Sequence, residues 1–111
     1  MRRLLALLLL LLPLPAAADD FSDAVAAYAD ADYEKAYQLW RPLAESGDAG
    51  AMFDLGVLYW EGQGIPRNRP LAIQWWQQAA KQDVAAAQYN LSLAHYLGEG
   101  VAQDTHKALS F

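Results

Sequence analysis

The chain has 111 residues, of which 55% are hydrophobic and 19% charged, and its 8 basic and 13 acidic residues give a net charge of −5. This acidic balance argues against nucleic-acid binding, because affinity for nucleic acids comes mainly from cationic side chains that neutralise phosphates. The sequence contains no cysteine, which excludes disulfide bonds, so a single domain of this size must be stabilised by apolar packing.

Residues 1–18 have the pattern of a secretory signal peptide. Arg2 and Arg3 form a basic head, residues 4–12 are wholly apolar, and three alanines end at Ala18, which is a typical small-residue cleavage pattern. The apolar run is too short to span a membrane, which takes about 20 apolar residues. We expect cleavage before Asp19 and a mature net charge of −7, two below that of the whole chain because two arginines are lost. The prediction is a periplasmic or secreted protein without stable membrane insertion.

The mature domain, residues 19–111, is predicted to begin with two helices, 21–29 and 33–46. A complete helix pair follows. Its first helix is predicted over 49–61, where Asp48 is a suitable N-cap because its side-chain oxygen can accept from free amides of the first turn.

The second helix of this pair is predicted to run from its N-cap Asn68 to about Gln82. Glycines in the preceding loop, residues 62–68, favour the end of one helix and a reversal of the chain. Pro70 lies in the first helical turn, where its missing amide costs little.

The same pattern then recurs 36 residues later. A helix is expected over 85–97, a loop over 98–104 and a further helix from about Thr105. The matching pairs include Ala51 and Ala87, Leu55 and Leu91, Gly62 and Gly98, Gly64 and Gly100, Ala72 and Ala108, and, toward the N-terminus, Ala36 and Ala72, Trp40 and Trp76. Self-similarity at a fixed period indicates a repeat architecture.

The last unit is expected to stop about halfway through its second helix, because Phe111 matches Trp75 in the middle of the preceding one. Ala108 and Phe111 would then form an open apolar edge. Such an edge favours a homodimer through the C-terminal end, completion by a partner, or a chain shortened from a longer parent.

Recurrent alanines at the predicted helix contacts let two backbones approach closely, while a bulky Trp or Tyr opposite fills the remaining space. The predicted fold class is therefore all-α: an α-α superhelix, or solenoid, of antiparallel helix pairs with a 36-residue repeat.

Several stretches of the sequence resemble the Sel1-like repeat family, a subclass of the tetratricopeptide-like helical repeats. They are the loop and helix start at 98–104 with Lys107-Ala108, the helix start at 85–91, and the segment 75–80. The resemblance covers roughly residues 33–111 and implies a right-handed solenoid that acts as an adaptor between proteins.

Three positions depart from the family pattern. Asp83 stands where a glycine is usual, Ser92 replaces the glycine that Gly56 supplies, and His95 replaces the tyrosine that Tyr59 supplies. Asp tolerates the left-handed conformation at moderate cost, so we expect Asp83 to end its helix as glycine would.

The sequence predicts no catalytic residue, no metal site and no cofactor. The Gly-x-Gly loops at 62–64 and 98–100 lack the preceding strand and the following lysine of a phosphate-binding loop. His95 and His106 are the only histidines, and no third ligand completes a metal site. Ser92 lies near His95, but no oxyanion hole accompanies the pair.

The predicted function is recognition of a protein or peptide partner. In helical repeats the first helix of each pair lines the concave side of the solenoid. The candidate partner-binding residues are those beside its buried stripe: Phe53, Asp54, Val57 and Trp60, followed by Tyr89, Asn90, Leu93 and Tyr96.

Asp54 and Asn90 occupy the same position in successive repeats, where an amide could hydrogen-bond the backbone of a bound peptide. Aromatic side chains nearby offer the contact area that binding hot spots usually use. The alternative for Trp60, Tyr89 and Tyr96 is that they fill the core between repeats. Two other hypotheses also stay open: an enzyme or enzyme subunit of the cell envelope, and a truncated fragment of a longer repeat protein.

Overall fold

The computed structural model describes residues 17–98, and within that range the chain forms five α-helices and no strand. The helices are α2 (Ala17–Ala29), α3 (Tyr33–Glu45), α4 (Ala49–Glu61), α5 (Arg69–Ala80) and α6 (Ala85–Leu97). The predicted all-α fold is confirmed. None of these helices is long and apolar enough to cross a membrane.

Two regions on which predictions were made lie outside the described residues. They are residues 1–16, most of the predicted signal peptide, and residues 99–111, which include the helix expected from Thr105 and the open apolar edge expected at Ala108 and Phe111.

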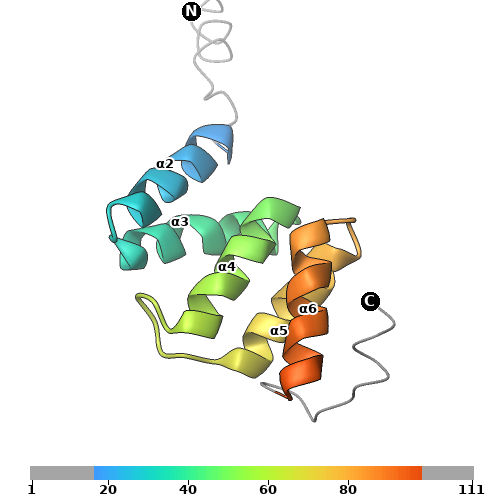
Figure 1. Ribbon diagram of the computed structural model, residues 1–111. Coiled ribbons are helices and arrows are strands. Elements are labelled where there is room, and N and C mark those ends of the chain that lie inside the picture. Colours follow the sequence, from blue (N-terminus) through green and yellow to red (C-terminus); the bar gives the residue numbers. More distant parts are fainter. Residues whose placement is uncertain (1–16, 99–111) are drawn as a thin grey trace, which may run out of the picture.

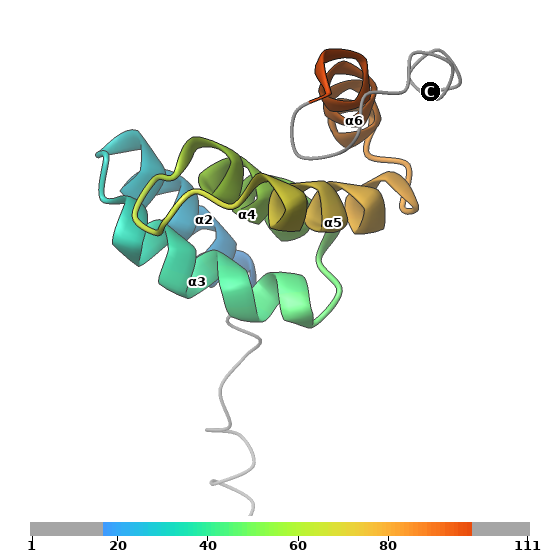
Figure 2. The same ribbon diagram turned by 90° about the horizontal axis from the view of Figure 1, so that it is seen from below.

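Each helix packs against the next one along the chain, α2 on α3, α3 on α4, α4 on α5 and α5 on α6. Figure 1 shows α2, α4 and α6 in one layer toward the viewer, with α3 and α5 behind them. Seen from below in Figure 2, α6 stands above α4 and α5, so the layer of first helices curves. Its concave side is the face seen in Figure 1.

The predicted capping residues stand at the start of α4, the end of α4 and the start of α5. The Asp48 carboxylate accepts from the Ala51 amide at 2.9 Å, and the Asn68 side chain accepts from the Leu71 amide at 3.1 Å. These bonds satisfy amides that a helix N-terminus leaves free. Gly62 ends α4 in the left-handed conformation, at φ 73°.

Three boundaries differ from the sequence prediction, and the smallest difference is that α3 ends at Glu45 instead of Ser46. α2 begins at Ala17 instead of residue 21, with Asp19 and Asp20 in its first turn, where negative charge stabilises the helix dipole. α5 ends at Ala80 instead of near Gln82. Asp83 then takes φ 65°, so the expectation that Asp stands in for a glycine after this helix is confirmed.

The core of the second helix pair is built around Trp76. Its ring lies between Phe53, with ring centroids 6.2 Å apart, and Trp60, at 5.2 Å. The indole Nε1 donates a hydrogen bond to the Phe53 carbonyl at 3.0 Å. This close approach depends on Gly56, because a Cβ there would lie 2.6 Å from Trp76 Cδ1.

The first helix pair repeats this arrangement around Trp40. Its ring lies between Phe21, at 6.3 Å between centroids, and Tyr28, at 5.8 Å. The buried Trp40 Nε1, however, has no hydrogen-bond partner in the described part of the chain. Ala24, which is fully buried, is the eighth residue of α2, as Gly56 is of α4.

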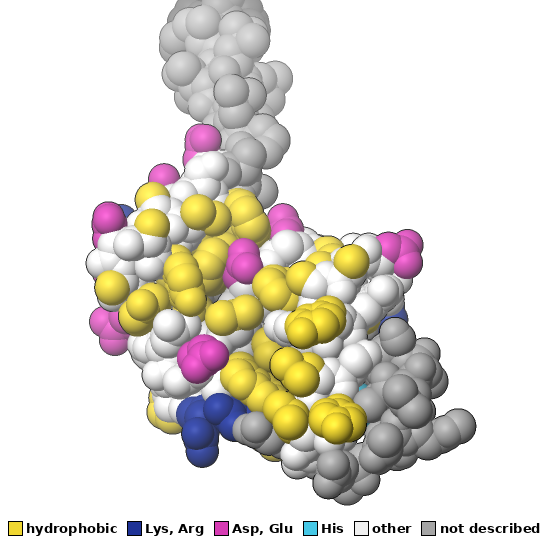
Figure 3. All heavy atoms as spheres, viewed as in Figure 1, with side chains coloured by type: hydrophobic (Ala, Val, Ile, Leu, Met, Phe, Trp, Pro, Cys, Tyr) yellow, Lys and Arg dark blue, Asp and Glu magenta, His cyan; other side chains and the backbone are white. Residues whose placement is uncertain are grey.

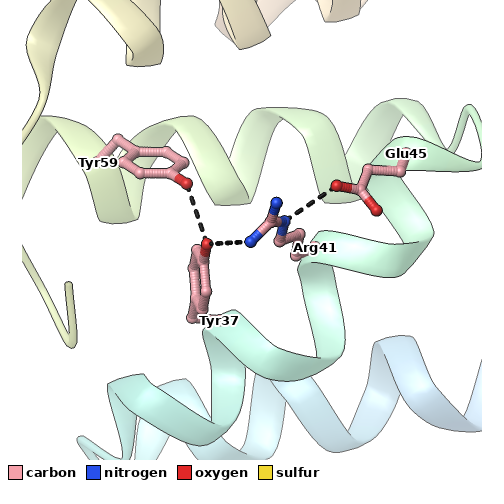
Figure 4. Close-up of polar contacts among 4 residues, drawn as sticks. All are labelled: Tyr37, Arg41, Glu45 and Tyr59. Atoms are coloured by element: carbon pink, nitrogen blue, oxygen red, sulfur yellow. Dashed lines mark hydrogen bonds and ion pairs between the residues drawn. The ribbon is translucent and has the colours of Figure 1, made fainter.

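A polar contact joins the two pairs. The hydroxyls of Tyr37 on α3 and Tyr59 on α4 lie 3.1 Å apart, and Arg41 donates to Tyr37 at 3.0 Å and to Glu45 at 2.9 Å (Figure 4). Burial, with the hydrogen bond to Tyr37, raises the pKa of Tyr59 to about 12, so the Tyr59 phenol is neutral at physiological pH. Arg41 and Glu45 are exposed, and such a pair adds little stability.

Candidate binding surface

The face formed by α2, α4 and α6 carries two adjoining clefts. The first, of about 300 Å³, lies between α4 and α6 over the start of α5. The second, of about 290 Å³, lies between α2 and α4 over α3. Val57 lines both. Figure 3 shows hydrophobic side chains spread over this face from α2 across α4 to α6, with acidic side chains among them.

Four of the eight predicted binding residues meet in the first cleft. Val57 and Trp60 line it from α4, and Asn90 and Leu93 line it from α6. The fold therefore brings equivalent faces of two successive repeats to one site.

Asp54 lies in the second cleft with Val57. Phe53 lines neither described cleft: it is half-buried and stacks on Trp76 with an interplanar angle of 29°. The sequence predicted Phe53 as a binding residue beside the buried stripe, whereas in the structure its ring packs on Trp76.

Tyr89 and Tyr96 lie on α6 outside the described clefts, and their side chains are 68% and 55% exposed. The next helix expected along the chain, from Thr105, lies outside the described residues, so the alternative that these two tyrosines fill the core between repeats stays a prediction. For Trp60 it is partly correct, since this residue packs on Trp76 and also lines the first cleft.

Arg69 lines the first cleft and contacts Trp60. Its guanidinium lies 4.5 Å from the centroid of the Trp60 ring, and its Nε donates to the Trp60 carbonyl at 3.2 Å. A cation over an indole face is attracted by the ring quadrupole. This contact fixes Trp60 as a wall of the cleft, with Glu61 beside it.

The second cleft has a different electrostatic character. Asp54 is half-buried, and burial, together with repulsion from Asp48, raises the pKa of its carboxyl to about 6. At neutral pH the carboxylate is ionised in a largely apolar setting, which disfavours the charge.

Sequence reasoning missed the contribution of α2, whose Val25 and Tyr28 line the second cleft. The signal was present at a different offset. Only three residues separate α2 from α3, whereas seven separate α4 from α5. The sequences of α2 and α4 therefore align at an offset of 32 residues instead of 36. At that offset Val25 falls on Val57 and Tyr28 on Trp60.

The described residues contain no group of three or more His, Cys, Asp or Glu side chains that could hold a metal ion. His95 is 3% exposed and lies in the core rather than at a surface. Ser92, one turn earlier on α6, is half-buried.

Comparison with known proteins gives one consistent result. The family model described as the Sel1 repeat matches residues 26–48, 49–84 and 85–111. Among curated proteins, no sequence matches this chain.

Two solved structures are similar to the fold described above. A Sel1 repeat protein from Oxalobacter formigenes superposes with a TM-score of 0.76 at 29% identity, over 81% of this chain and 37% of that one. The protein c5321, a protective antigen of uropathogenic Escherichia coli strains with an SLR fold, superposes with a TM-score of 0.77 at 26% identity, over 85% and 21%. The chain thus spans well under half the length of either.

Proposed function

This chain belongs to the Sel1 repeat family, whose members are helical-repeat scaffolds for protein–protein interaction, and we propose that it binds a segment of a partner protein along its concave face. The two adjoining clefts of that face are the observation that carries the proposal. They join three first helices into one surface that a single extended segment could follow.

The side chains of this surface suit such a segment. Val25, Val57 and Leu93 occupy equivalent positions on α2, α4 and α6, and Val25 and Leu93 are 46% and 43% exposed. Apolar side chains at regular intervals offer contacts to a partner's side chains, while Asn90 in the first cleft has an amide that both donates and accepts.

A site-specific crosslinking experiment tests this surface. A photoreactive amino acid is placed at Leu93 in the groove or at Gln77, which is exposed on α5, and each protein is incubated with envelope extract. We expect a discrete crosslinked partner from position 93 and none from position 77. Leu93→Lys should abolish capture by an affinity-tagged chain, whereas Gln77→Lys should preserve it. Equal capture by both variants, or crosslinks only from position 77, contradicts the concave face.

We further propose that the chain is exported to the periplasm or secreted, on the sequence pattern of residues 1–18. The predicted cleavage point after Ala18 falls within α2, so cleavage would leave Asp19 and Asp20 at the start of a shorter helix. N-terminal sequencing of the protein recovered from the periplasm or medium should begin at Asp19. Recovery of the chain in the cytoplasm with residues 1–18 intact contradicts export.

A further inference from the structure

The second cleft, between α2 and α4, combines a carboxylate with aromatic and aliphatic walls. Val25 and Tyr28 contribute from α2, Trp40 from α3, and Asp54 and Val57 from α4. Its volume of about 290 Å³ is enough for one amino-acid side chain.

Asp54 has no hydrogen bond or ion pair within the described residues. The charge of Asp48 repels it. A half-buried carboxylate without a compensating group costs stability, and groups of this kind concentrate at functional sites.

The equivalent positions in the neighbouring repeats are neutral. Asp54 is the sixth residue of α4, and the sixth residues of α2 and α6 are Ser22 and Asn90. A neutral amide or hydroxyl both donates and accepts hydrogen bonds, whereas an ionised carboxylate only accepts. Position 54 therefore requires a donor, and one of positive charge would also remove the electrostatic cost.

The walls of the cleft suit a cation on an aliphatic stem. Tyr28 and Trp40 present aromatic rings, which attract ammonium and guanidinium groups. Val25 and Val57 offer apolar contacts to the methylene groups that lysine and arginine carry below their charged ends. The acidic net charge of the chain, −5, favours the approach of a basic partner.

Resting on the proposed function, we propose that this cleft binds a lysine or arginine side chain of the partner segment, with Asp54 as its counter-ion. The apolar cleft between α4 and α6 then receives a neighbouring apolar residue of the same segment. The partner is thereby a protein that presents a basic residue beside an apolar one.

Small probes test the pocket without knowledge of the partner. Butylammonium represents a lysine side chain, propylguanidinium represents arginine, and 1-butanol has a similar stem without charge. Binding is followed by nuclear magnetic resonance at the Val25 and Asp54 amides and the Trp40 indole. We expect at least about tenfold tighter binding of one of the cations than of 1-butanol. Whichever cation binds more tightly identifies the side chain.

The matched variants are Asp54→Asn and Asp83→Asn, which remove the same charge inside and outside the pocket. Asp83 is exposed and has a left-handed backbone, which Asn tolerates. Asp54→Asn should weaken cation binding about tenfold, and Asp83→Asn should leave it within about twofold. Equal binding of 1-butanol and both cations, or unchanged cation binding by Asp54→Asn, overturns the proposal.

The crosslinking experiment described above separates this inference from the proposed function. A partner that crosslinks at position 93 yet binds Asp54→Asn as tightly as the unchanged chain overturns the basic residue and leaves the groove in place. Charge-selective probe binding without any crosslinked partner supports the pocket and contradicts the proposed function.

Discussion

The first and second helix pairs place the same aromatic cluster in the core, but only one completes its hydrogen bond. Trp76 lies between Phe53 and Trp60 and donates to the Phe53 carbonyl. Trp40 lies between Phe21 and Tyr28, and its buried Nε1 has no partner among the described residues.

The difference is explained by one methyl group. Gly56 allows the indole of Trp76 to reach the helix backbone, whereas the equivalent residue of the first pair is Ala24. We infer that the methyl group of Ala24 occupies the space that Gly56 leaves open in the second pair, and so keeps the Trp40 indole from the matching carbonyl. The comparison teaches that the close approach of Trp76 to the backbone of α4 depends on the absence of a side chain at position 56.

The largest effect is expected from Gly56→Ala, which gives the second pair the residue of the first. The new Cβ meets the Trp76 ring at 2.6 Å from Cδ1 and 3.0 Å from Cε2, so the ring must move and lose its hydrogen bond. Overpacking and the lost bond together should lower the free energy of unfolding by about 3 kcal/mol, measured by urea denaturation.

Gly50→Ala is the control, because the atoms nearest to its Cβ are those of the Phe21 ring, at 3.3 Å, and the Asp48 carboxylate, at 3.4 Å. Its effect should stay within about 1 kcal/mol. A Gly56→Ala variant as stable as Gly50→Ala would refute the methyl-group explanation.

A smaller difference is expected between Trp76→Phe and Trp40→Phe. Both remove similar ring volume from the core. Trp76→Phe also breaks a hydrogen bond, whereas Trp40→Phe removes a buried donor that has no partner in the described part of the chain. Trp76→Phe should therefore cost about 2 kcal/mol more than Trp40→Phe. The two denaturation curves decide this directly, and equal losses would mean that the Trp40 donor is satisfied in solution.

Asp54→Asn makes the second repeat match the third, where Asn90 stands. The folded-state pKa of about 6 lies above the ordinary 3.8, so the folded state retains the proton more strongly, and stability decreases as pH rises from about 4 to 6. The variant should gain about 1 kcal/mol at pH 7, allowing for partial solvent screening, and almost nothing at pH 4.

Denaturation of both proteins at these two pH values measures the gain. Asp83→Asn, exposed on the surface, serves as the control and should show no comparable pH-dependent gain. An equal gain from Asp54→Asn at both pH values would show that ionisation is not its cause.

The smallest effect concerns the polar contact between Tyr37 and Tyr59, which the next pair of helices lacks, because the equivalent positions hold Ile73 and His95. Tyr59→Phe should cost about 0.5 to 1 kcal/mol. A double-mutant cycle with Tyr37→Phe should give a coupling of about 0.5 kcal/mol. Strict additivity of the two single variants would show that the hydroxyl pair adds no stability.

Much of the fold was predictable from local signals. The caps Asp48 and Asn68, the glycine that ends α4 and the left-handed Asp83 were all identified from sequence and are confirmed. These features act within a few residues, so local spacing is enough to reveal them.

The candidate surface was less predictable, because it depends on which helices meet. The first cleft brings together Val57, Trp60, Asn90 and Leu93, as the repeat implied. The residues that α2 contributes to the second cleft were missed, because the loop between α2 and α3 is shorter than the equivalent loop between α4 and α5. Helical periodicity did not separate Phe53, which covers Trp76, from Asp54, which faces a cleft. The two are adjacent in the chain, and only their tertiary neighbours distinguish them.

The sequence by itself determined the helical repeat, the capped ends of α4 and the start of α5, and the family, because periodic apolar residues and turn residues act at short range. The tertiary structure alone decided that His95 is buried, that the Trp40 indole has no hydrogen-bond partner within residues 17–98, and that Asp54 lines one cleft with Tyr28 and Trp40. These properties arise from the distances between packed helices, which depend on the side chains of two or three helices at once.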